Sequence, residues 1–308
     1  MTLASPPLVD ILIVTYNQEK FVATAIESAL SQRTSFPFRI IVSDDGSTDQ
    51  TLGIVRYWER RFSETITVIA NPHNVGLVEN YRRGFAACSA RYLAILEGDD
   101  FWHDRSKLQI QVDILEAHVS VGLVHSGYRV LEESKQIFRE NNAALVRYCS
   151  TSNGLGYRDL LQNNPICAVT VVCRRELLAD VDFDWMATSG YRTVDYHLWL
   201  QCATKSTIYY VNRCLATYRV SRQSISNDRN FERRAKFVLN HLDVIRYFIK
   251  RHPIAEFDFR ARSADIHTYL FFLALKGGRF VEAFRYFRLS SFGGAVFVMR
   301  QSRLYRKL

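Results

Sequence analysis

The sequence lacks any uninterrupted apolar run of about 18 residues, and this absence argues against a membrane-spanning helix. No basic start followed by an apolar stretch opens the chain, so we expect no secretory signal peptide. The six cysteines include no Cys-x-x-Cys pair, which argues against both a zinc ribbon and a disulfide scaffold. Together these absences predict a protein of the reducing cytoplasm.

The common phosphate-binding loops are absent as well. No Gly-x-x-x-x-Gly-Lys-Ser/Thr loop occurs, and no Gly-x-Gly-x-x-Gly motif follows the first expected strand. The eight histidines show no His-x-x-x-His spacing, and the chain contains no calcium-binding loop of the EF-hand type. A nucleotide would therefore have to be bound by other groups.

Charge is distributed unevenly along the 308 residues, which carry 40 Lys and Arg against 31 Asp and Glu. Residues 1–230 hold 24 basic and 25 acidic residues, whereas residues 231–308 hold 16 and 6. A nucleic-acid enzyme more often surrounds its active cleft with basic residues, so we expect no nucleic acid as a partner. The cationic last quarter favours an anionic surface, most simply a membrane leaflet.

Short β-branched runs alternate with helical patterns in the first 130 residues. The runs expected to be strands are Val9–Thr15, Phe38–Ser43, Thr65–Ala70 and Tyr92–Leu96. The segments expected to be helices are Glu19–Gln32, Thr51–Phe62, Leu77–Cys88 and Lys107–His118. This alternation predicts an α/β fold with a mostly parallel sheet that helices cover on both faces.

The pattern changes in the second half of the chain. Residues 131–164 are interpreted as loops around a short helix. The elements expected after them are a strand at Ala168–Cys173, a helix at Thr193–Ala203 and paired strands at Thr207–Asn212 and Leu215–Val220. Beyond Asn230 the pattern is helical, with breaks at Pro253 and at Gly277-Gly278.

These observations predict two domains. Residues 1–230 would form the catalytic domain, and residues 231–308 a basic, largely helical C-terminal extension. The extension places Phe280, Phe284 and Phe287 on one stripe, with Arg279, Arg285 and Arg288 beside it. A basic, aromatic, amphipathic segment of this kind can lie in a lipid interface. The alternative is a helical pair that packs on the catalytic domain, with its arginines in solvent.

Acidic residues follow two of the expected parallel strands. Asp44 and Asp45 come after the second strand, and Asp99 and Asp100 come after the fourth. Ligands of open α/β sheets bind beyond the carboxyl ends of the strands, and adjacent carboxylates repel each other unless a cation or donor offsets the charge. Both pairs therefore favour Mg²⁺ or Mn²⁺, which binds one or two carboxylates together with phosphate oxygens and water. The alternative is that these are ordinary turn residues, with Asp49 as a helix cap.

Four segments together resemble the family 2 glycosyltransferases in their order and spacing. They are Ile11-Leu-Ile-Val-Thr-Tyr-Asn17, Ile41-Val-Ser-Asp-Asp-Gly-Ser-Thr-Asp49, Asn74-Val-Gly76 and Leu96-Glu-Gly-Asp-Asp100. The resemblance covers about residues 8–225 and implies the Rossmann-like GT-A fold and an inverting enzyme that uses nucleotide sugars. Residues 97–102, with the following Lys107-Leu-Gln, are most similar to bacterial enzymes that build surface polysaccharides.

The resemblance implies a nucleotide site on the matching positions. Thr15, Tyr16 and Asn17 are expected to border the base, and Asp45 to hydrogen-bond it, with Asp44 as its companion.

The family's acidic metal-binding motif, usually called DXD, matches the second acidic pair. Asp100 is the expected direct metal ligand, and Asp99 is also assigned to the metal and lies nearer the ribose. Asn74 is expected to contribute to the donor site. Arg82 or Arg83, on the following helix, would face the donor, with a solvated helix charge as the alternative.

The family places its catalytic base at the start of a helix that reads roughly Asp-x-x-x-Trp, and Asp195-Tyr-His-Leu-Trp199 fits. Asp195 would accept the proton of the acceptor hydroxyl as that oxygen attacks the anomeric carbon. The alternative is a helix N-terminal charge that the helix dipole stabilises. His197 is interpreted as a packing residue, because two positions along a helix it points elsewhere.

Tyr218–Ser226 resembles the segment that closes over the diphosphate in this family. Many members carry a histidine where this chain has Ser221 or Arg222. Arg219 or Arg222 would then supply the positive charge, because a guanidinium binds phosphate through two parallel hydrogen bonds.

The resulting hypothesis is a cytoplasmic enzyme, peripheral on the inner face of the membrane, with Mn²⁺ or Mg²⁺ as cofactor. It would move a hexose or deoxyhexose from a nucleoside-diphosphate sugar to a hydroxyl of a glycan or lipid-linked saccharide. A sugar-phosphate nucleotidyltransferase is the enzymatic alternative, since it also uses sheet-edge carboxylates and Mg²⁺. A basic binding module without activity is a third, which the balanced charge of residues 1–230 disfavours.

Overall fold

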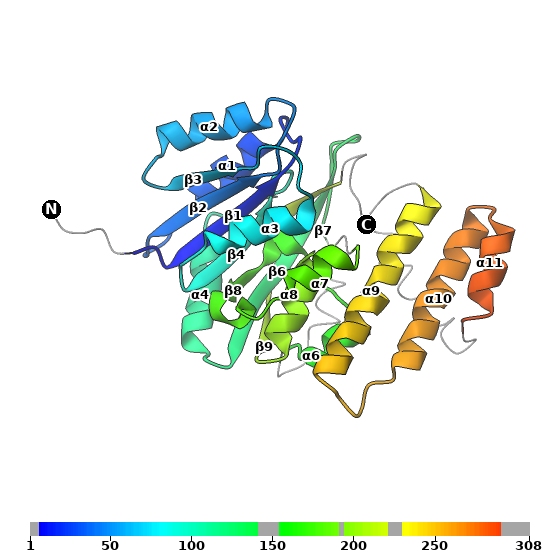
Figure 1. Cartoon of the computed structure of the whole chain (residues 1–308). Helices are drawn as coiled ribbons and strands as arrows, with labels where there is room; N and C mark the ends of the chain where they lie inside the picture. The colour runs from blue at the N-terminus through cyan, green and yellow to red at the C-terminus, as the bar shows by residue number, and fades with distance from the viewer. Residues whose placement is uncertain (1–5, 141–153, 191–193, 221–229, 291–308) are drawn as a thin grey trace. The chain divides into compact units, whose positions relative to one another are not determined.

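The computed structural model describes residues 6–140, 154–190, 194–220 and 230–290 (Figure 1). The chain divides into two compact units. Unit 1 consists of Met1–Leu160 and Pro165–Arg219, and unit 2 consists of Leu161–Asn164 and Val220–Leu308.

Four parallel strands form one half of the sheet of unit 1, in the order β3-β2-β1-β4. They are β1 (Val9–Thr15), β2 (Phe38–Asp44), β3 (Ile66–Ala70) and β4 (Tyr92–Glu97). β1 and β4 are almost wholly buried, as parallel strands covered on both faces require. Thr15 pairs with Asp44, and Val14 pairs with Glu97. Three strands therefore end at the same edge of the sheet.

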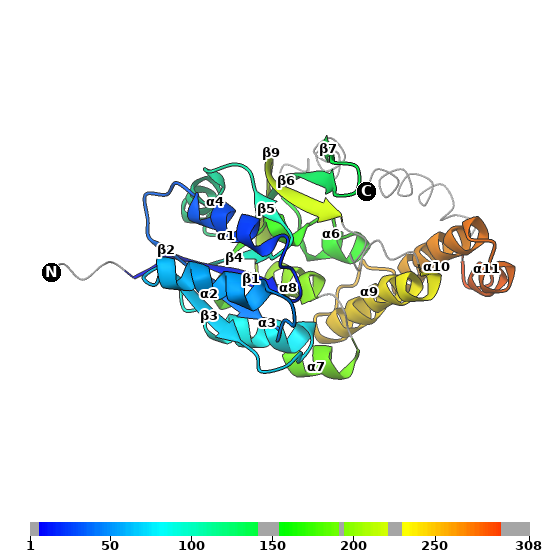
Figure 2. The same cartoon turned by 90° about the horizontal axis from the view of Figure 1, so that it is seen from above.

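Helices cover both faces of this half. They are α1 (Val22–Leu30), α2 (Thr51–Arg61), α3 (Leu77–Ala86) and α4 (Lys107–Ala117). Figure 2 shows α1 and α4 on one side of the sheet and α3 on the other. The expected strands and helices of the first 120 residues are confirmed, with ends that differ by about three residues or fewer.

The sheet continues beyond β4 in the order β8-β6-β9-β5, and β7 pairs with β6. These strands are β5 (Phe101–Trp102), β6 (Val121–Glu132), β7 (Ile137–Glu140), β8 (Val172–Arg174) and β9 (Thr207–Val220). β8 is antiparallel to β4 and to β6, and β5 is antiparallel to β9. The sheet is thus mixed, and the expected parallel arrangement is confined to the β3-β2-β1-β4 half.

Three expectations for the second half of unit 1 are wrong. β6 extends to Glu132 and forms a hairpin with β7, where loops were expected, because every residue of β7 is exposed and its sequence shows no alternation of apolar and polar residues. The expected strand at 168–173 begins instead with a 3₁₀ turn, η1 (Ala168–Thr170), and only then becomes β8. The expected strand pair at 207–220 is the single strand β9, since no Gly or Pro interrupts it.

The other helical elements in the described residues up to 203 are short, apart from α8. They are α6 (Tyr157–Gln162), the 3₁₀ turn η2 (Arg175–Leu178), α7 (Phe183–Thr188) and α8 (Val194–Ala203). The Asp182 carboxylate accepts a hydrogen bond from the N–H of Trp185 and so caps α7. α3 contacts both α7 and α8, which brings the first turn of α8 to the side of the sheet that α3 covers.

Unit 2 contains the helices α9 (Phe231–Arg251), α10 (Phe259–Lys276) and α11 (Phe280–Phe287). Asn230 and Asp258 cap α9 and α10 by accepting hydrogen bonds from N–H groups of the first turn. The expected breaks are confirmed, because α9 ends before Pro253 and α10 ends before Gly277. No helix in the described parts of the chain has the length and hydrophobicity needed to cross a bilayer.

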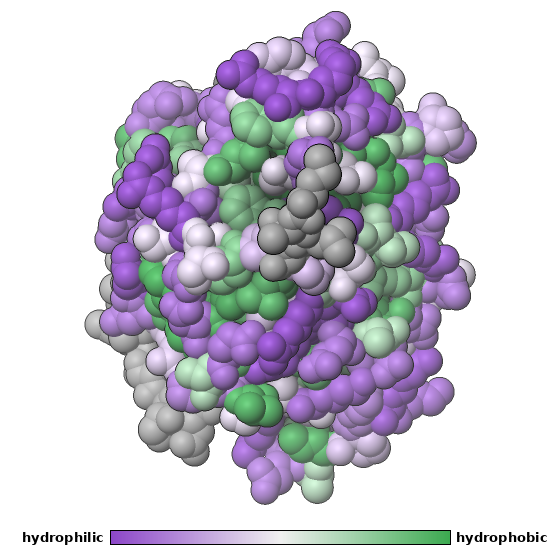
Figure 3. All heavy atoms as spheres, turned by 90° about the vertical axis from the view of Figure 1, so that its left-hand side faces the viewer, coloured by the Kyte–Doolittle hydropathy of each residue, from purple (hydrophilic) through white to green (hydrophobic). Residues whose placement is uncertain are grey.

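Figure 3 shows the surface from the side where the N-terminus lies. Hydrophobic side chains gather around the start of the chain, and hydrophilic side chains cover most of the rest of that face. The site described next lies instead at the carboxyl ends of the parallel strands, where β1, β2 and β4 end.

Candidate active site

Asp44, the last residue of β2, closes its own loop. Its carboxylate accepts hydrogen bonds from the N–H of Ser47, at 2.9 Å, and from the hydroxyl of the same residue. The loop turns at Gly46, where φ is +68° and a Cβ atom would lie only 2.4 Å from the backbone carbon of His73. A side chain at this position would force the two loops apart. The carboxylate of Asp44 is thus buried, and both of its oxygens accept hydrogen bonds within its own loop.

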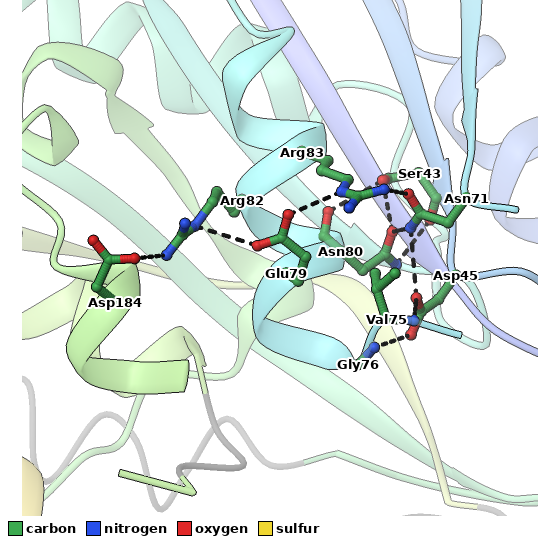
Figure 4. A network of polar contacts seen from close by, with 10 residues as sticks. All are labelled: Ser43, Asp45, Asn71, Val75, Gly76, Glu79, Asn80, Arg82, Arg83 and Asp184. Carbon is green, nitrogen blue, oxygen red and sulfur yellow. Dashed lines mark hydrogen bonds and ion pairs between the residues drawn. The ribbon is translucent and has the colours of Figure 1, made fainter. Parts of the chain in front are cut away.

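Asp45 ties the β2–α2 loop to the start of α3 (Figure 4). Its two oxygens accept hydrogen bonds from the N–H groups of Val75, at 2.8 Å, and Gly76, at 3.1 Å. These amides lie at the positive N-terminal end of α3, which stabilises a carboxylate there. N–H donors therefore offset the repulsion between Asp44 and Asp45. This pair thus needs no cation, and the expected contact of Asp45 with the base stays a prediction.

A buried polar network supports this corner and was not anticipated from the sequence (Figure 4). The Ser43 hydroxyl donates to Asn80 Oδ1 at 2.7 Å, and Asn80 Nδ2 donates to the Ser43 carbonyl at 3.1 Å. Asn71 Nδ2 also donates to Asn80 Oδ1, at 3.1 Å. The sequence around each asparagine does not predict this network, because the groups that hydrogen-bond one another come from three separate segments of the chain.

Arg82 points away from Asp45, toward α7 (Figure 4). Its guanidinium forms ion pairs with Asp184 on α7 and with Glu79 on its own helix. Asp184 is largely exposed, so this surface ion pair is weak and a ligand can displace it. Arg83 is held by Glu79 and by Asn71 Oδ1. A donor-binding role for Arg82 stays a prediction, and Asn74 is exposed in the preceding loop.

The loop after β1 clips onto the β2–α2 loop. Asn17 has a φ of 52°, its N–H donates to Ser47 Oγ at 2.9 Å, and its side-chain oxygen accepts from the N–H of Thr48 at 2.8 Å. Tyr16 is exposed beside it and presents an aromatic ring to solvent. Thr15 is buried at the end of the strand. Tyr16 is the most exposed of the three residues expected to border the base, and that role stays a prediction for all three.

The loop after β4 packs closely against the loop after β1. A Cβ atom on Gly98 would lie 2.3 Å from Gln18 Oε1, so glycine is needed for this approach. Thr15 Oγ1 donates to Gln18 Oε1 at 2.8 Å, and the Gln18 side chain hydrogen-bonds Asp99. Gln18 was not predicted as a site residue. It connects the end of β1 to the second acidic pair.

Asp100 differs from the first pair in one respect. Its Oδ1 accepts a hydrogen bond of 2.7 Å from the backbone N–H of Arg219, the residue before the last of β9. Its Oδ2 is buried and has no hydrogen-bond partner among the described residues. A buried carboxylate oxygen without a donor is costly. A ligand that binds this oxygen would remove the cost.

Burial and mutual repulsion raise the pKa values of the acidic residues after β4. Burial is the main cause at each position, and the charge of Asp99 adds to it at Glu97, whose pKa rises to about 8. The pKa of Asp100 is raised well above its usual range by burial and by the charges of Asp99 and Glu97. The pKa of Asp99 is raised less, because Arg219 and Gln18 stabilise its charged form. Without a positive ligand, these carboxyls are therefore costly to ionise together.

Asp195 belongs to the same group of carboxyls. It lies in the first turn of α8, and burial raises its pKa to about 6 although backbone N–H groups lower it. Its charge contributes to the raised pKa of Glu97. A carboxylate with a pKa near the working pH is suited to act as a general base. His197 is buried on the same helix, with its ring 5.7 Å from that of Trp185.

Two further side chains at this cluster were missed by the sequence analysis. Tyr81 is buried on α3, and burial together with the charges of Glu97, Asp195, Asp100 and Asp99 raises its pKa well above the usual value. Its hydroxyl therefore keeps its proton and can donate. Burial and three of the same carboxyls raise the pKa of the Cys167 thiol.

Arg219 lies beside the cluster, and its expected role at the diphosphate stays a prediction. Its Nε donates to the Asp99 carbonyl at 2.8 Å, and the guanidinium packs on the ring of Phe21 and pairs with Glu133. This side chain is therefore fixed in place and balanced in charge. Arg222 lies outside the described residues, so its expected role has no structural account.

The carboxylate oxygens around Asp100 fit a divalent cation only together with further oxygen atoms from a bound ligand. Among residues 6–140, 154–190, 194–220 and 230–290, no three His, Cys, Asp or Glu side chains form a ready-made metal site. Mg²⁺ and Mn²⁺ prefer oxygen ligands and often take one or two carboxylates, with phosphate oxygens and water in the other positions. The unsatisfied Oδ2 of Asp100, next to Asp99, meets that requirement.

Residues 10–181 match the family model described as glycosyl transferase family 2. The chain belongs to this family. The match contains β1 to β4, α3 and both acidic pairs, and it ends before α8 and Asp195.

The proteins similar to this chain include bacterial glycosyltransferases. The chain is 28% identical over 225 residues to the putative teichuronic acid biosynthesis glycosyltransferase TuaG of Bacillus subtilis, covering 72% of this chain and 83% of that one. It is 28% identical over 252 residues to WfgD of Escherichia coli, a UDP-Glc:alpha-D-GlcNAc-diphosphoundecaprenol beta-1,3-glucosyltransferase, covering 80% and 88%. Against an uncharacterized protein of Mycobacterium tuberculosis, also 28% identical, the match covers 73% of this chain but only 62% of that protein.

Solved structures confirm the GT-A-like fold. The mannosyltransferase PcManGT of Pyrobaculum calidifontis, in complex with GDP-Man and Mn²⁺, aligns with a TM-score of 0.59 at 16% identity, covering 98% of this chain and 81% of that one. TarS of S. aureus, residues 1–349 in complex with UDP-GlcNAc, aligns with a TM-score of 0.55 at 15% identity, covering 89% of each chain. At these identities the likeness establishes the fold alone.

Proposed function

We propose that this family 2 member is a metal-dependent inverting glycosyltransferase. It moves a sugar from a nucleoside-diphosphate sugar to a hydroxyl of a glycan or lipid-linked saccharide in bacterial polysaccharide synthesis. The observation that carries the proposal is the cluster of Glu97, Asp99, Asp100 and Asp195, in which the buried Oδ2 of Asp100 has no donor among the described residues. A positive ligand would allow these carboxyls to ionise together by offsetting their mutual repulsion.

Asp100 and Asp99 would hold Mn²⁺ or Mg²⁺ together with the diphosphate of the donor. The cation would supply charge neutralisation for the departing nucleoside diphosphate. A structural neighbour, PcManGT, is described in complex with GDP-Man and Mn²⁺, which agrees with this assignment. The chain itself orients the Asp100 carboxylate. The backbone N–H of Arg219 hydrogen-bonds Oδ1, so Oδ2 would be left to bind the ligand.

Asp195 would take the proton of the acceptor hydroxyl. As the proton leaves, the acceptor oxygen forms a bond to the anomeric carbon from the face opposite the diphosphate. The bond between that carbon and the phosphate oxygen breaks, the nucleoside diphosphate departs with the electron pair, and the configuration is inverted. No covalent intermediate with the protein is needed. The raised pKa of Asp195, about 6, keeps the group basic yet largely ionised at neutral pH.

A lipid-linked acceptor is favoured by the relatives. WfgD and WfaP of Escherichia coli are both described as glucosyltransferases that act on a diphosphoundecaprenol-linked sugar. An acceptor of this type is anchored in the membrane. The proposal therefore includes a cytoplasmic enzyme that contacts the inner face of the membrane through its basic C-terminal residues, 231–308.

Ligand binding and product analysis test the function. Each of UDP, GDP and dTDP is added to the purified chain with and without Mn²⁺, and the thermal midpoint is measured. A nucleotide that binds the native state raises the midpoint, and we expect the rise to require the cation. No rise with any of the three nucleotides, with or without cation, would contradict the proposed site.

The products distinguish transfer from the alternative chemistry. Sugar transfer releases a nucleoside diphosphate, whereas a sugar-phosphate nucleotidyltransferase releases pyrophosphate. We expect nucleoside diphosphate from the matching nucleotide sugar and no pyrophosphate from sugar phosphate plus nucleoside triphosphate. The reverse result would replace the proposed function by nucleotidyl transfer.

A further inference from the structure

Helix α11 has two unlike faces within unit 2. Tyr286 packs against the hydrophobic core of the unit, with its ring 6.3 Å from that of Phe231, and Ala283 is buried on the same side. On the other side Phe280 is 73% exposed, Val281 82% and Phe284 64%. Large apolar side chains with this exposure are unusual when they occur together.

The neighbouring helix extends this apolar surface. α10 and α11 are in contact, and the ring of Phe287 lies 5.4 Å from that of Phe271 on α10. Phe272 and Leu275 of α10 are exposed as well. We call the exposed apolar residues of these two helices the α10–α11 face: Phe272, Leu275, Phe280, Val281, Phe284 and Phe287.

Positive charge surrounds the α10–α11 face. Lys276, Arg285 and Arg288 are exposed and form no ion pair with any described residue. Glu282 is the sole acidic residue between positions 276 and 288, and Arg279 pairs with it at 2.9 Å. The aromatic surface therefore carries three unneutralised cations and no free anion.

Exposed aromatic rings next to unpaired cations indicate which kind of partner binds the α10–α11 face. Aromatic rings at the edge of a bilayer, flanked by Lys and Arg, bind where apolar chains meet anionic headgroups. A second copy of the chain is disfavoured, because a two-fold symmetric contact through this face would bring two sets of unneutralised cations together. A neutral apolar partner would leave the three cations without counter-charge.

We propose that the α10–α11 face docks on an anionic lipid surface, with the phenylalanine rings at acyl-chain depth and the three cations on phosphate headgroups. The inference rests on the proposed function in one respect only, namely the use of the docking. Docking would hold the enzyme at the membrane that carries a lipid-linked acceptor. Lipid binding itself depends on the residues of the face.

Vesicle co-sedimentation of the full chain tests the docking. Vesicles of phosphatidylcholine are compared with vesicles that also contain phosphatidylglycerol, and we expect binding to the latter, weakened by salt. The double substitution Phe280→Ser/Phe284→Ser is expected to lower partitioning about tenfold or more. Arg285→Gln/Arg288→Gln is expected to lower binding to anionic vesicles by a similar factor, about 1 kcal/mol for each charge, and to leave neutral vesicles unaffected.

A matched control uses exposed apolar residues of unit 1. Val119→Ser/Phe138→Ser removes two exposed side chains elsewhere and should bind vesicles like the unchanged chain. Circular dichroism and the thermal midpoint verify folding of each variant. Light scattering measures the oligomeric state of the unchanged chain and of Phe280→Ser/Phe284→Ser.

Three results would overturn the docking proposal. They are failure of the unchanged chain to bind phosphatidylglycerol vesicles, equal binding by Phe280→Ser/Phe284→Ser, and a dimer that this substitution dissociates. Nucleoside diphosphate release with a water-soluble acceptor is measured on the same variants and should be unchanged. Vesicle binding without any nucleotide-sugar turnover would refute the proposed function and leave the docking intact.

Discussion

The two Asp-Asp pairs of this chain look alike in the sequence and differ in the fold. Both follow a buried parallel strand, and both lie at the same edge of the sheet. Asp44 and Asp45 accept hydrogen bonds from Ser47, Val75 and Gly76, so backbone amides neutralise them. Asp100 keeps one buried oxygen without a donor, in a cluster where Glu97 and Asp99 raise its pKa.

The comparison teaches that adjacent carboxylates do not by themselves define a metal site. What decides is the supply of N–H donors that the surrounding loops bring to each oxygen. The first pair lies beside the N-terminus of α3 and receives two amides. The second pair receives the amide of Arg219 at Asp100 and, at Asp99, donors from its own backbone and from Gln18, but it lies among other carboxyls and one oxygen of Asp100 has no donor among the described residues. The first pair is thus held by amide donors, whereas the second keeps a buried carboxylate oxygen without a donor among the described residues.

Exchanging one member of each pair should separate activity from stability. Asp100→Asn is expected to lower sugar transfer by about 10³-fold or more, since the cation loses its main ligand, while the thermal midpoint stays the same or rises. Asp45→Asn should instead lower the free energy of unfolding by about 1–3 kcal/mol, because an amide NH₂ would face the N–H groups of Val75 and Gly76. Product release and thermal denaturation are measured on both variants. Equal losses of activity and stability in the two variants would erase the distinction.

Asp195→Asn removes the expected base and leaves the cation ligands in place. We expect the turnover number to fall by at least about 10²-fold, while Mn²⁺-dependent binding of the nucleoside diphosphate is retained. Steady-state kinetics and the thermal shift with nucleotide provide the two measurements. A variant that loses donor binding as well would assign Asp195 to the donor site instead.

The pH dependence of transfer follows from the same residue. Burial raises the pKa of Asp195 to about 6, and a base works only when it is deprotonated. As the pH falls through 6 the protonated fraction grows, so the rate should fall about tenfold for each further unit of pH. Rates are measured with saturating donor from about pH 5 to about pH 8, a range that includes the expected inflection. The residual rate of Asp195→Asn should lack this inflection, and an identical profile in the variant would refute the assignment.

Among the variants around the second pair, Tyr81→Phe is expected to cause the smallest loss of sugar transfer. The hydroxyl is lost but the buried ring remains, so the fold should keep its thermal midpoint. Loss of one neutral donor among the carboxyls should lower transfer by about fivefold, the equivalent of roughly 1 kcal/mol. Tyr57→Phe, on the exposed side of α2, is the matched control and should leave transfer unchanged. A similar rate for both variants would remove Tyr81 from the site.

The sequence was informative wherever a short segment decides its own structure. The β-branched run of β1 and the apolar stripe of α3 are local patterns, and both elements form where expected. The hairpin of β6 with β7 was missed because β7 is exposed on every residue and shows no alternation. β9 was divided in two because its polar residues resemble a turn, although an extended strand accommodates them.

The same limit applies to the candidate site. Asp99, Asp100 and Asp195 were identified by motif, and the fold gathers them in one electrostatic cluster. The orientation of Arg82 could not be foreseen, since its partner Asp184 lies about a hundred positions along the chain. Tyr81 was invisible for the same reason, because its neighbours are brought together only by the packing of α3, β4 and α8.

The amide of Arg219 that holds Oδ1 of Asp100 belongs to the main chain, and this has a practical consequence. Any residue except proline can make the same contact, so replacement of the arginine side chain leaves the orientation of Asp100 intact. Insertion or deletion of one residue within β9 has the opposite effect, because it would turn the neighbouring carbonyl or side chain toward the carboxylate. A change of the Arg219 side chain can therefore test its bonds to Asp99 and Glu133 without moving Oδ1 of Asp100, whereas the length of the strand is fixed.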